Sequence, residues 1–338
     1  MAAAALAVAL PLWGGQAESP AFRVDVQLVS VVATVKDPSG AVVTGLDKDD
    51  FTVLAGGVPQ QIAHFERQTG RPLSVVLLFD ASSTVAKELR FEQEAAHRFV
   101  RHLLSRGAHP QDRVAVYEFT SHVNEITDFT GSLSRLEKAL YAIRPKGGTS
   151  LYDAIYLASE RLEKREGRKV IIAVTDGGDT TSNKEFADSL AAAQKAEAAV
   201  YSIIVVPVTS DAGRNLGGEN ALRTLSGATG GVWFRQHTEG DLDRAFGQIE
   251  RDLRIQYLLG FYPRNVPPSQ DRFYRLEVQV RREGLEVLAR NGYYGEASPP
   301  DSAPSDRTVS LPAAAPRARQ KSPPAAAPQP KRPLRSIP

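Results

Sequence analysis

Cysteine is absent from this chain of 338 residues, which excludes disulfide bonds, thiolate metal ligands and cysteine nucleophiles together. Long hydrophobic runs are absent as well. No stretch reaches the roughly 20 apolar residues that a membrane-spanning helix needs, so we expect no membrane span in the mature chain. The fold must therefore be held by ordinary packing, and the length suggests about two domains.

The chain also lacks a strong excess of one charge. Its 41 Lys and Arg against 39 Asp and Glu give a formal net charge of +2. Residues 297–338 carry seven Arg or Lys and two Asp, so this tail has a charge of +5 and the remainder has −3. A slightly acidic folded part gives weak support for nucleic-acid binding, and we predict no nucleic-acid partner.

Sequence marks of common catalytic sites are missing too. The six histidines show no zinc-binding spacing, and His97 and His102, five residues apart, fall on different faces of a helix. No GxSxG motif marks a serine nucleophile. We therefore predict that the chain is not an enzyme.

The two ends of the chain differ in composition from the rest. Residues 1–17 form an apolar run that ends in small residues at a cleavage-like spacing, which predicts a secretory signal peptide and an exported protein, periplasmic, cell-surface or secreted. Because this run contains no Lys or Arg, a truncated start or an alanine-rich leader is the alternative. Residues 297–338 hold half of the 22 prolines and are predicted to be disordered, either as a tether or as a solvated tail.

Patterns typical of β-strands lie on both sides of a central region. Within residues 18–70, short runs separated by turn residues predict strands at 22–28, 31–35, 41–43, 51–54 and 62–65. Residues 255–296 contain similar runs at 256–262, 273–280 and 285–289. We predict that the two sets form one β-sandwich around an inserted domain, because the termini of an inserted domain lie close together. Two independent β appendages are the alternative.

Strands and helices alternate in the central region, residues 71–254. Six strands are predicted, at 73–79, 113–119, 122–129, 169–175, 200–206 and 232–234, with about six helices between and after them. Capping-box spacings at Ser134 and Glu137, and at Ser182 and Glu185, are expected to begin two of these helices. The alternation predicts an α/β fold with a parallel sheet.

Oxygen-bearing side chains follow the ends of two predicted strands. Asp80, Ser82 and Thr84 come directly after the first strand, Asp176 follows the strand at 169–175, and Thr149 precedes a helix. The carboxyl ends of parallel strands share one edge of a sheet, so we expect the five side chains to converge. Two carboxylates and three hydroxyls suit a hard cation such as Mg²⁺. An open position on that ion would accept an Asp or Glu of a protein partner.

Other interpretations of these residues remain. Each of them alone is typical of a turn or a helix cap, and Asp153 and Asp179 nearby are expected to be a helix-surface residue and a turn residue. A Mg²⁺-dependent phosphotransferase or hydrolase is one alternative, although Ser82 stands where such an enzyme has its second carboxylate. The order of Gly and Lys in residues 146–150 is also wrong for a phosphate loop. A metal-stabilised scaffold that binds no partner carboxylate is the other alternative.

Three motifs together resemble the metal-ion-dependent adhesion site of the von Willebrand factor type A family, which has DxSxS, a later Thr and a later Asp. They are Asp80-Ala81-Ser82-Ser83-Thr84, Gly147-Gly148-Thr149 and Thr175-Asp176-Gly177. The resemblance implies a Rossmann-like, doubly wound and mostly parallel sheet over about residues 71–254. It also implies a protein-interaction or adhesion role in which Mg²⁺, Mn²⁺ or Ca²⁺ is bound directly by Ser82, Thr84 and Thr149, and directly or through water by Asp80 and Asp176.

The flanking segments add to this resemblance. Segments such as Gly45-Leu46, Asp50-Phe51, Tyr257 to Pro263 and Arg290 to Tyr293 are similar to those of exported bacterial proteins related to the same family. The one departure within the motifs is Thr84, where the family usually has Ser. Threonine keeps the hydroxyl and adds a methyl group, so the metal-binding role is expected to survive.

Overall fold

The computed structural model describes residues 27–67, 70–85, 88–105, 108–206 and 215–295. The predicted signal peptide, residues 1–17, and the predicted tail, residues 297–338, lie outside the described residues. Among the described residues, no helix has the length and apolar character to cross a membrane.

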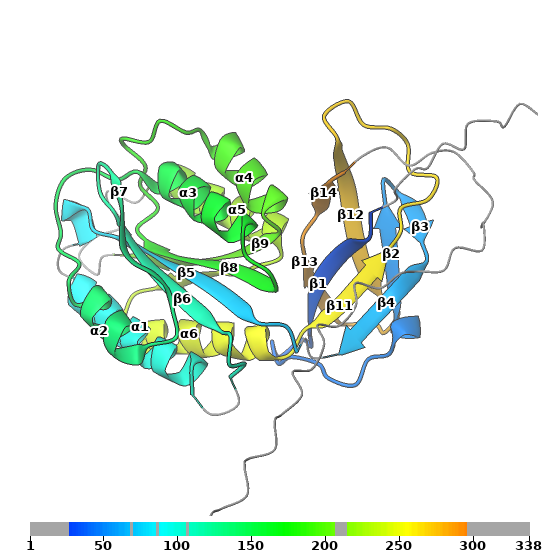
Figure 1. The fold of residues 1–338 in the computed structure, drawn as a ribbon, viewed down its shortest axis with the longest axis horizontal. Coiled ribbons are helices and arrows are strands. Elements are labelled where there is room, and N and C mark those ends of the chain that lie inside the picture. The colour runs from blue at the N-terminus through cyan, green and yellow to red at the C-terminus, as the bar shows by residue number, and fades with distance from the viewer. Residues whose placement is uncertain (1–26, 68–69, 86–87, 106–107, 207–214, 296–338) are drawn as a thin grey trace, which may run out of the picture. The chain divides into compact units, whose positions relative to one another are not determined.

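A six-stranded sheet forms the centre of the α/β part (Figure 1). Its strand order is β10-β9-β8-β5-β6-β7, in which β7 pairs antiparallel with β6 and the other neighbours pair in parallel. This arrangement confirms the predicted α/β fold with a mostly parallel sheet. The strands are β5 (Leu73–Asp80), β6 (Arg113–Phe119), β7 (Val123–Thr130), β8 (Arg168–Thr175), β9 (Ala198–Val205) and β10 (Trp233–Gln236).

Helices cover both faces of this sheet (Figure 1). One face packs against α1 (Leu89–Leu103), α2 (Leu133–Leu140) and α6 (Glu239–Arg254), and the other against α3 (Leu151–Glu163), α4 (Phe186–Lys195) and α5 (Leu216–Thr229). Successive side chains of β5 alternate between the two cores: Val75, Leu77 and Phe79 enter one, whereas Val76 and Leu78 enter the other. A strand buried on both faces has a nearly continuous apolar sequence, as β5 does.

Strands from before and after the α/β part combine in two antiparallel sheets, with the orders β13-β1-β11-β4 and β14-β12-β2-β3. Each sheet contains strands from both sides of residues 71–254, which confirms the predicted combination and excludes two independent appendages. Side chains of the two sheets share one core. The strands are β1 (Val29–Lys36), β2 (Phe51–Ala55), β3 (Val58–Gln60), β4 (Ile62–Arg67), β11 (Tyr257–Phe261), β12 (Phe273–Val280), β13 (Glu286–Ala289) and β14 (Gly292–Tyr294).

Several strand predictions differ from the structure. Of the strand predicted at 22–28, residues 22–26 lie outside the described residues, and Gln27 and Leu28 belong to no strand. β14 was not predicted. Residues 41–43 form no regular strand, and Val42 makes only an isolated bridge to Lys36. Conversely, β3 was not predicted, because Pro59 interrupts its short apolar run. β3 lies at the edge of its sheet. A proline is tolerated there, because an edge strand has a neighbour on one side only and needs fewer backbone N–H donors.

Two helix starts were also predicted in the wrong register. α2 begins after Ser132, whose side chain accepts a hydrogen bond from the N–H of Arg135, and not at Ser134. α4 begins after Glu185, whose N–H donates to the Asp188 carboxylate at 3.0 Å. Polar residues are dense before both helices, so several spacings satisfy the capping pattern and the sequence alone does not select one.

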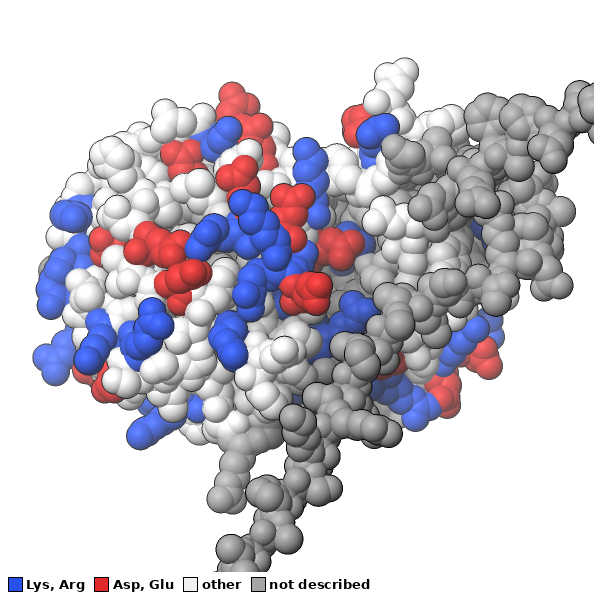
Figure 2. Space-filling model, in the orientation of Figure 1, with Lys and Arg blue, Asp and Glu red and all other residues white. Residues whose placement is uncertain are grey.

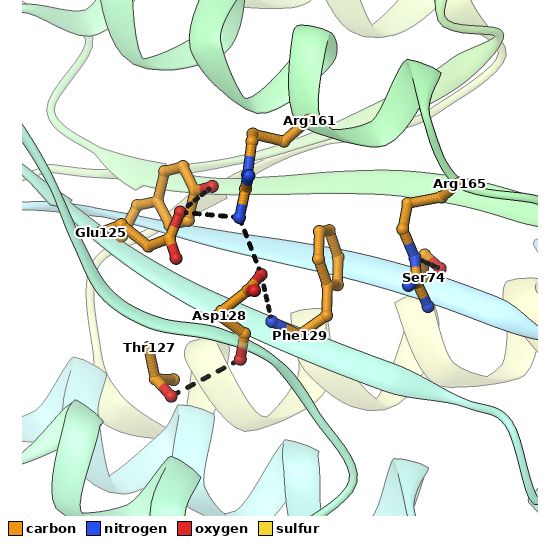
Figure 3. Close-up of polar contacts among 8 residues, drawn as sticks. Ser74, Glu125, Thr127, Asp128, Phe129, Arg161 and Arg165 are labelled. Carbon is orange, nitrogen blue, oxygen red and sulfur yellow. Dashed lines mark hydrogen bonds and ion pairs between the residues drawn. The ribbon is translucent and has the colours of Figure 1, made fainter.

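Ion pairs connect α3 with the antiparallel edge strand β7 (Figure 3). Arg161 lies between two carboxylates of β7, at 3.2 Å from Glu125 and 3.0 Å from Asp128. The guanidinium group of Arg165 lies 4.8 Å from the centre of the Phe129 ring. The charges in this cluster balance one another, so we assign it a structural role in covering the edge of the sheet. On the face of the molecule in Figure 2, basic and acidic side chains likewise intermingle.

A buried ion pair connects β1 with α6. Nζ of Lys36 lies 2.7 Å from Oδ2 of Asp252, and the exposed fractions of the two side chains are 9% and 0%. Gln248 donates a hydrogen bond to the other carboxylate oxygen at 2.7 Å. Burial raises the pKa of Asp252, and the hydrogen bond from Lys36 opposes this rise. A charge pair taken out of water in this way stabilises the fold only while both partners are present.

We expect Lys36→Met to lower the free energy of unfolding by about 3 to 5 kcal/mol, because the Asp252 carboxylate would stay buried without its cation. Urea unfolding followed by circular dichroism measures this loss. Arg90→Ala is the control, since it breaks a solvent-exposed pair with Glu94 and should change stability by less than about 0.5 kcal/mol. Equal effects of the two substitutions would contradict the role assigned to burial.

Candidate functional site

Four of the five predicted side chains lie at the edge formed by the carboxyl ends of β5 and β8, which are adjacent strands. Asp80 is the last residue of β5, and Asp176 directly follows β8. Ser82 precedes the short 3₁₀ helix η2 (Ser83–Val85), and Thr149 lies in the loop just before α3. Thr84 belongs to η2, but its side chain lies outside what the structure describes.

The Asp80 carboxylate is buried and firmly held. Its Oδ1 accepts the N–H of Ser82 at 2.9 Å, and its Oδ2 accepts the hydroxyl of Thr175 at 2.7 Å. Burial is the main cause of a raised pKa of Asp80, and the nearby negative charge of Asp176 raises it further. Hydrogen bonds from Thr175 and Ser82 act in the opposite direction. The ionised carboxylate is therefore electrostatically unfavourable here, and a nearby cation would relieve it.

Main-chain hydrogen bonds join the loop after β5 to the loop before α3. The N–H of Lys146 donates to the carbonyl of Ala81 at 2.7 Å, and the N–H of Ser83 donates to the carbonyl of Gly147 at 3.4 Å. Gly147 adopts a φ of 72°, a left-handed conformation that favours glycine. These contacts bring Thr149 to the edge where Asp80 lies, although the two residues are far apart in sequence.

Thr149 and Asp176 approach each other through the loop that follows β8. The carbonyl of Thr149 accepts the N–H groups of Thr180 and Thr181 at 2.8 and 3.1 Å. Oδ1 of Asp176 accepts the N–H of Gly178 at 2.9 Å. A methyl group added at Gly178 would lie 3.1 Å from this Oδ1 and 4.0 Å from Oγ1 of Thr149. The side-chain oxygens of Asp176 and Thr149 therefore both lie near Gly178.

Asp153 and Asp179 have structural roles, as predicted. Asp179 accepts the N–H of Tyr152 at 3.0 Å, in the first turn of α3. Asp153 accepts the N–H groups of Asn183 and Lys184, at 3.1 and 2.8 Å. Together these hydrogen bonds fasten the start of α3 to the loop after β8, and so they support the position of Thr149.

Glu92 is a neighbour of this edge that the sequence interpretation missed. It lies on the inner face of α1 and is fully buried, and neither of its carboxyl oxygens has a hydrogen-bond partner among the described residues. Burial raises the pKa of Glu92 well above its usual value, and the negative charges of Asp80, Glu88 and Asp176 raise it further. A glutamate within the apolar stripe of this helix, between Leu89 and Ala96, was the available signal.

The chemistry of the converging side chains fits a hard cation. Asp80 and Asp176 supply carboxylates, and Ser82 and Thr149 supply hydroxyls, which are the oxygen ligands that Mg²⁺ and Ca²⁺ prefer. In the part of the chain that the structure describes, no three His, Cys, Asp or Glu side chains are grouped so that they could hold a metal ion. Any cation at this edge would therefore depend on the hydroxyl oxygens, which disfavours soft transition metals.

The start of α5 packs against the turn that follows Asp176. A Cβ atom added at Gly218 would overlap the carbonyl oxygen of Gly177, so the two backbones are in direct contact. The side chain of Asn215 caps the helix and accepts the N–H of Gly218 at 2.9 Å. This contact fixes the backbone next to Asp176.

Residues 75–178 match the family model described as von Willebrand factor type A domain. The match confirms the resemblance inferred from the three motifs over this range, which contains all five predicted site residues: Asp80, Ser82, Thr84, Thr149 and Asp176.

Several solved structures are similar to this chain. The conserved hypothetical protein BatB from Bacteroides thetaiotaomicron is 21% identical over 53% of this chain and 98% of its own length, with a TM-score of 0.42. The vWF domain of the type V pili tip protein Mfa5 from Porphyromonas gingivalis is 16% identical over 54% of this chain and 94% of its own, with a TM-score of 0.43. The PilB minor pilin from Streptococcus sanguinis is 14% identical over 55% of this chain and 63% of its own, with a TM-score of 0.43.

We expect Gly218→Ala to lower the free energy of unfolding by about 1 to 3 kcal/mol, because the new methyl group must displace the backbone of Gly177. Urea unfolding measures this change. Gly227→Ala is a matched control in the same helix, since nothing lies within 4 Å of its added methyl group. The control should gain about 0.5 to 1 kcal/mol from the better helix former. Equal stability of the two variants would contradict the close approach at Gly218.

Proposed function

We propose that this chain is a protein-interaction or adhesion module that binds a divalent cation, Mg²⁺, Mn²⁺ or Ca²⁺, and through it a carboxylate of a protein partner. The observation that carries this proposal is the convergence of Asp80, Ser82, Thr149 and Asp176 at the edge between β5 and β8. The match of residues 75–178 to the von Willebrand factor type A domain supports a role in protein interaction.

Each residue has a distinct role in the proposed site. The hydroxyls of Ser82, Thr84 and Thr149 bind the cation, and the carboxylates of Asp80 and Asp176 balance its charge. Both oxygens of Asp80 already accept one hydrogen bond, but a carboxylate oxygen can accept more than one. Asp80 can therefore act on the ion directly or through water. The bound cation keeps an open coordination position, and an Asp or Glu of the partner binds there.

The composition of the site favours binding over catalysis. The position two residues after Asp80 is Ser82, so this segment lacks the pair of carboxylates with which a Mg²⁺-dependent phosphotransferase provides a nucleophile and a general acid. The Asp80 carboxylate is also buried and held by Ser82 and Thr175, whereas an attacking nucleophile must reach its substrate.

An adhesion role requires that the partner and the site meet outside the cytoplasm. The apolar run at residues 1–17, which ends in small residues, supports export of the chain. A pull-down from the envelope fraction of the producing organism, eluted with a chelator, would identify the partner.

We expect Asp80→Asn to weaken Mg²⁺ binding by about 10- to 100-fold, the usual cost of disturbing a residue that supports a metal site. The substitution keeps the shape of the side chain and removes its charge. Isothermal titration of the full chain with MgCl₂ measures the affinity. Asp49→Asn is the control, because Asp49 is an exposed carboxylate in the 3₁₀ helix η1 (Lys48–Asp50) of the antiparallel part and should bind Mg²⁺ like the wild type.

Binding of an acidic peptide, in Mg²⁺ and in EDTA, tests the second half of the proposal. We expect binding that EDTA and Asp80→Asn both abolish. Peptide binding that is unchanged by EDTA would overturn the adhesion mechanism. Mg²⁺ binding without peptide binding would favour a metal-stabilised scaffold, and Mg²⁺-dependent phosphoester hydrolysis that is lost in Asp80→Asn would favour an enzyme.

A further inference from the structure

Glu92 is a buried acidic group that the packing of the fold does not explain. Its side chain belongs to the face of α1 whose neighbours Leu89 and Ala96 enter the same hydrophobic core as Ala81, next to Asp80. Buried carboxyl groups in folded proteins normally have hydrogen-bond partners. Both oxygens of Glu92 lack one among the residues that the structure describes. A buried carboxyl group without a partner calls for an explanation, and a functional role at a nearby ion site is one.

Besides burial, the charges that act on Glu92 favour a role at a cation site. They are Asp80, Glu88 and Asp176, and all of them are acidic. Two of them, Asp80 and Asp176, are the carboxylates of the proposed cation site. A group of negative charges in a poorly solvated region is unfavourable, because the charges repel one another. A divalent cation among them would attract each carboxylate and so turn this repulsion into a net attraction.

Glu92 does not belong to an acidic cluster that could hold an ion by itself. Among the described residues, no three acidic or histidine side chains are grouped closely enough to hold an ion together. The negative charges of Asp80 and Asp176 thus act on Glu92, but the three carboxylates are not grouped as one set of ligands. Charge interactions through the protein interior are only weakly screened, so a contact with the ion is not needed for an effect on its affinity.

We propose that Glu92 is a third acidic residue of the cation site, which strengthens binding of the divalent ion from the core side of α1 without belonging to its ligands. This inference rests on the proposed function. It assigns a role in metal affinity to a residue outside the three sequence motifs. None of the three motifs contains a residue of α1.

The proposal predicts opposite effects of one substitution on stability and on metal binding. Without a cation, the unpartnered carboxyl group of Glu92 destabilises the core, so an apolar side chain of similar size should stabilise the metal-free protein. The same change should weaken the cation site. A residue with only a packing role would change stability without changing the affinity for Mg²⁺.

We therefore expect Glu92→Gln and Glu92→Leu each to weaken Mg²⁺ binding by about 10- to 100-fold, as substitutions outside the ligand shell commonly do. Titration calorimetry of the full chain with MgCl₂ measures the affinity. Thermal unfolding in EDTA should show a higher Tm for Glu92→Leu than for the wild type, and the rise in Tm on adding Mg²⁺ should be smaller in both variants.

Glu94→Gln is the matched control. It removes the same charge from the same helix, but Glu94 is partly exposed and pairs with Arg90. Its Mg²⁺ affinity should stay within about twofold of the wild type, because water screens a charge at the surface.

Two outcomes would overturn the inference, and they are distinguishable. If the wild type binds Mg²⁺ and both Glu92 variants bind it within about twofold of the wild type, the range expected of a screened surface charge, Glu92 has no role and the proposed function stands. If the wild type itself binds no Mg²⁺ and matches Asp80→Asn, the proposed function fails and the role of Glu92 fails with it. Should Glu92→Leu not fold, Glu92→Gln, which keeps the shape of the side chain, decides the question alone.

Discussion

Burial of both faces of β5 and β8 is the constraint on which the rest of this structure depends. Helices cover each face, so polar side chains can leave these strands only at their ends. At the carboxyl ends, the hydroxyl of Thr175 on β8 donates to the carboxylate of Asp80 on β5, and this hydrogen bond joins the two strands at the edge. The loops that carry Thr149 and Gly178 then close around this edge through main-chain hydrogen bonds. The candidate site is thus a product of the sheet and not of any single loop.

The sequence predicts the features that depend on local patterns. The apolar run before Asp80 identifies a doubly buried strand, and parallel strands bring their carboxyl ends to one edge, so the position of Asp80 relative to Asp176 follows from chain order. Features that depend on distant partners are missed. β3 needs its neighbour β2 to become a strand around Pro59. Glu92 interrupts the apolar stripe of α1, but only its burial and the charges of Asp80 and Asp176 that act on it relate it to the site.

Electrostatics explains why the site and the core cannot be treated separately. Asp80 and Glu92 are both fully buried, and burial raises the pKa of each. A fold optimised for stability alone would replace such groups with apolar side chains. The buried pair of Lys36 and Asp252 shows the contrasting solution, in which a carboxylate removed from water has its own cation at 2.7 Å. Under the proposed function, the acidic groups near β5 would have a bound cation in its place.

The pairing of β1 with β11 and of β2 with β12 has a consequence for the order of folding. Residues 71–254 form their sheet from strands that are close in sequence, whereas both antiparallel sheets need strands from opposite sides of that segment. During synthesis from the N-terminus, β1 to β4 emerge first. β2 can pair with β3 at once, whereas β1 and β4 stay without their partners until residues beyond 255 have followed. Contacts of such long sequence separation form late and slowly. The α/β part can therefore fold first. Its folded termini then bring β1 and β4 close to β11, with which both strands pair.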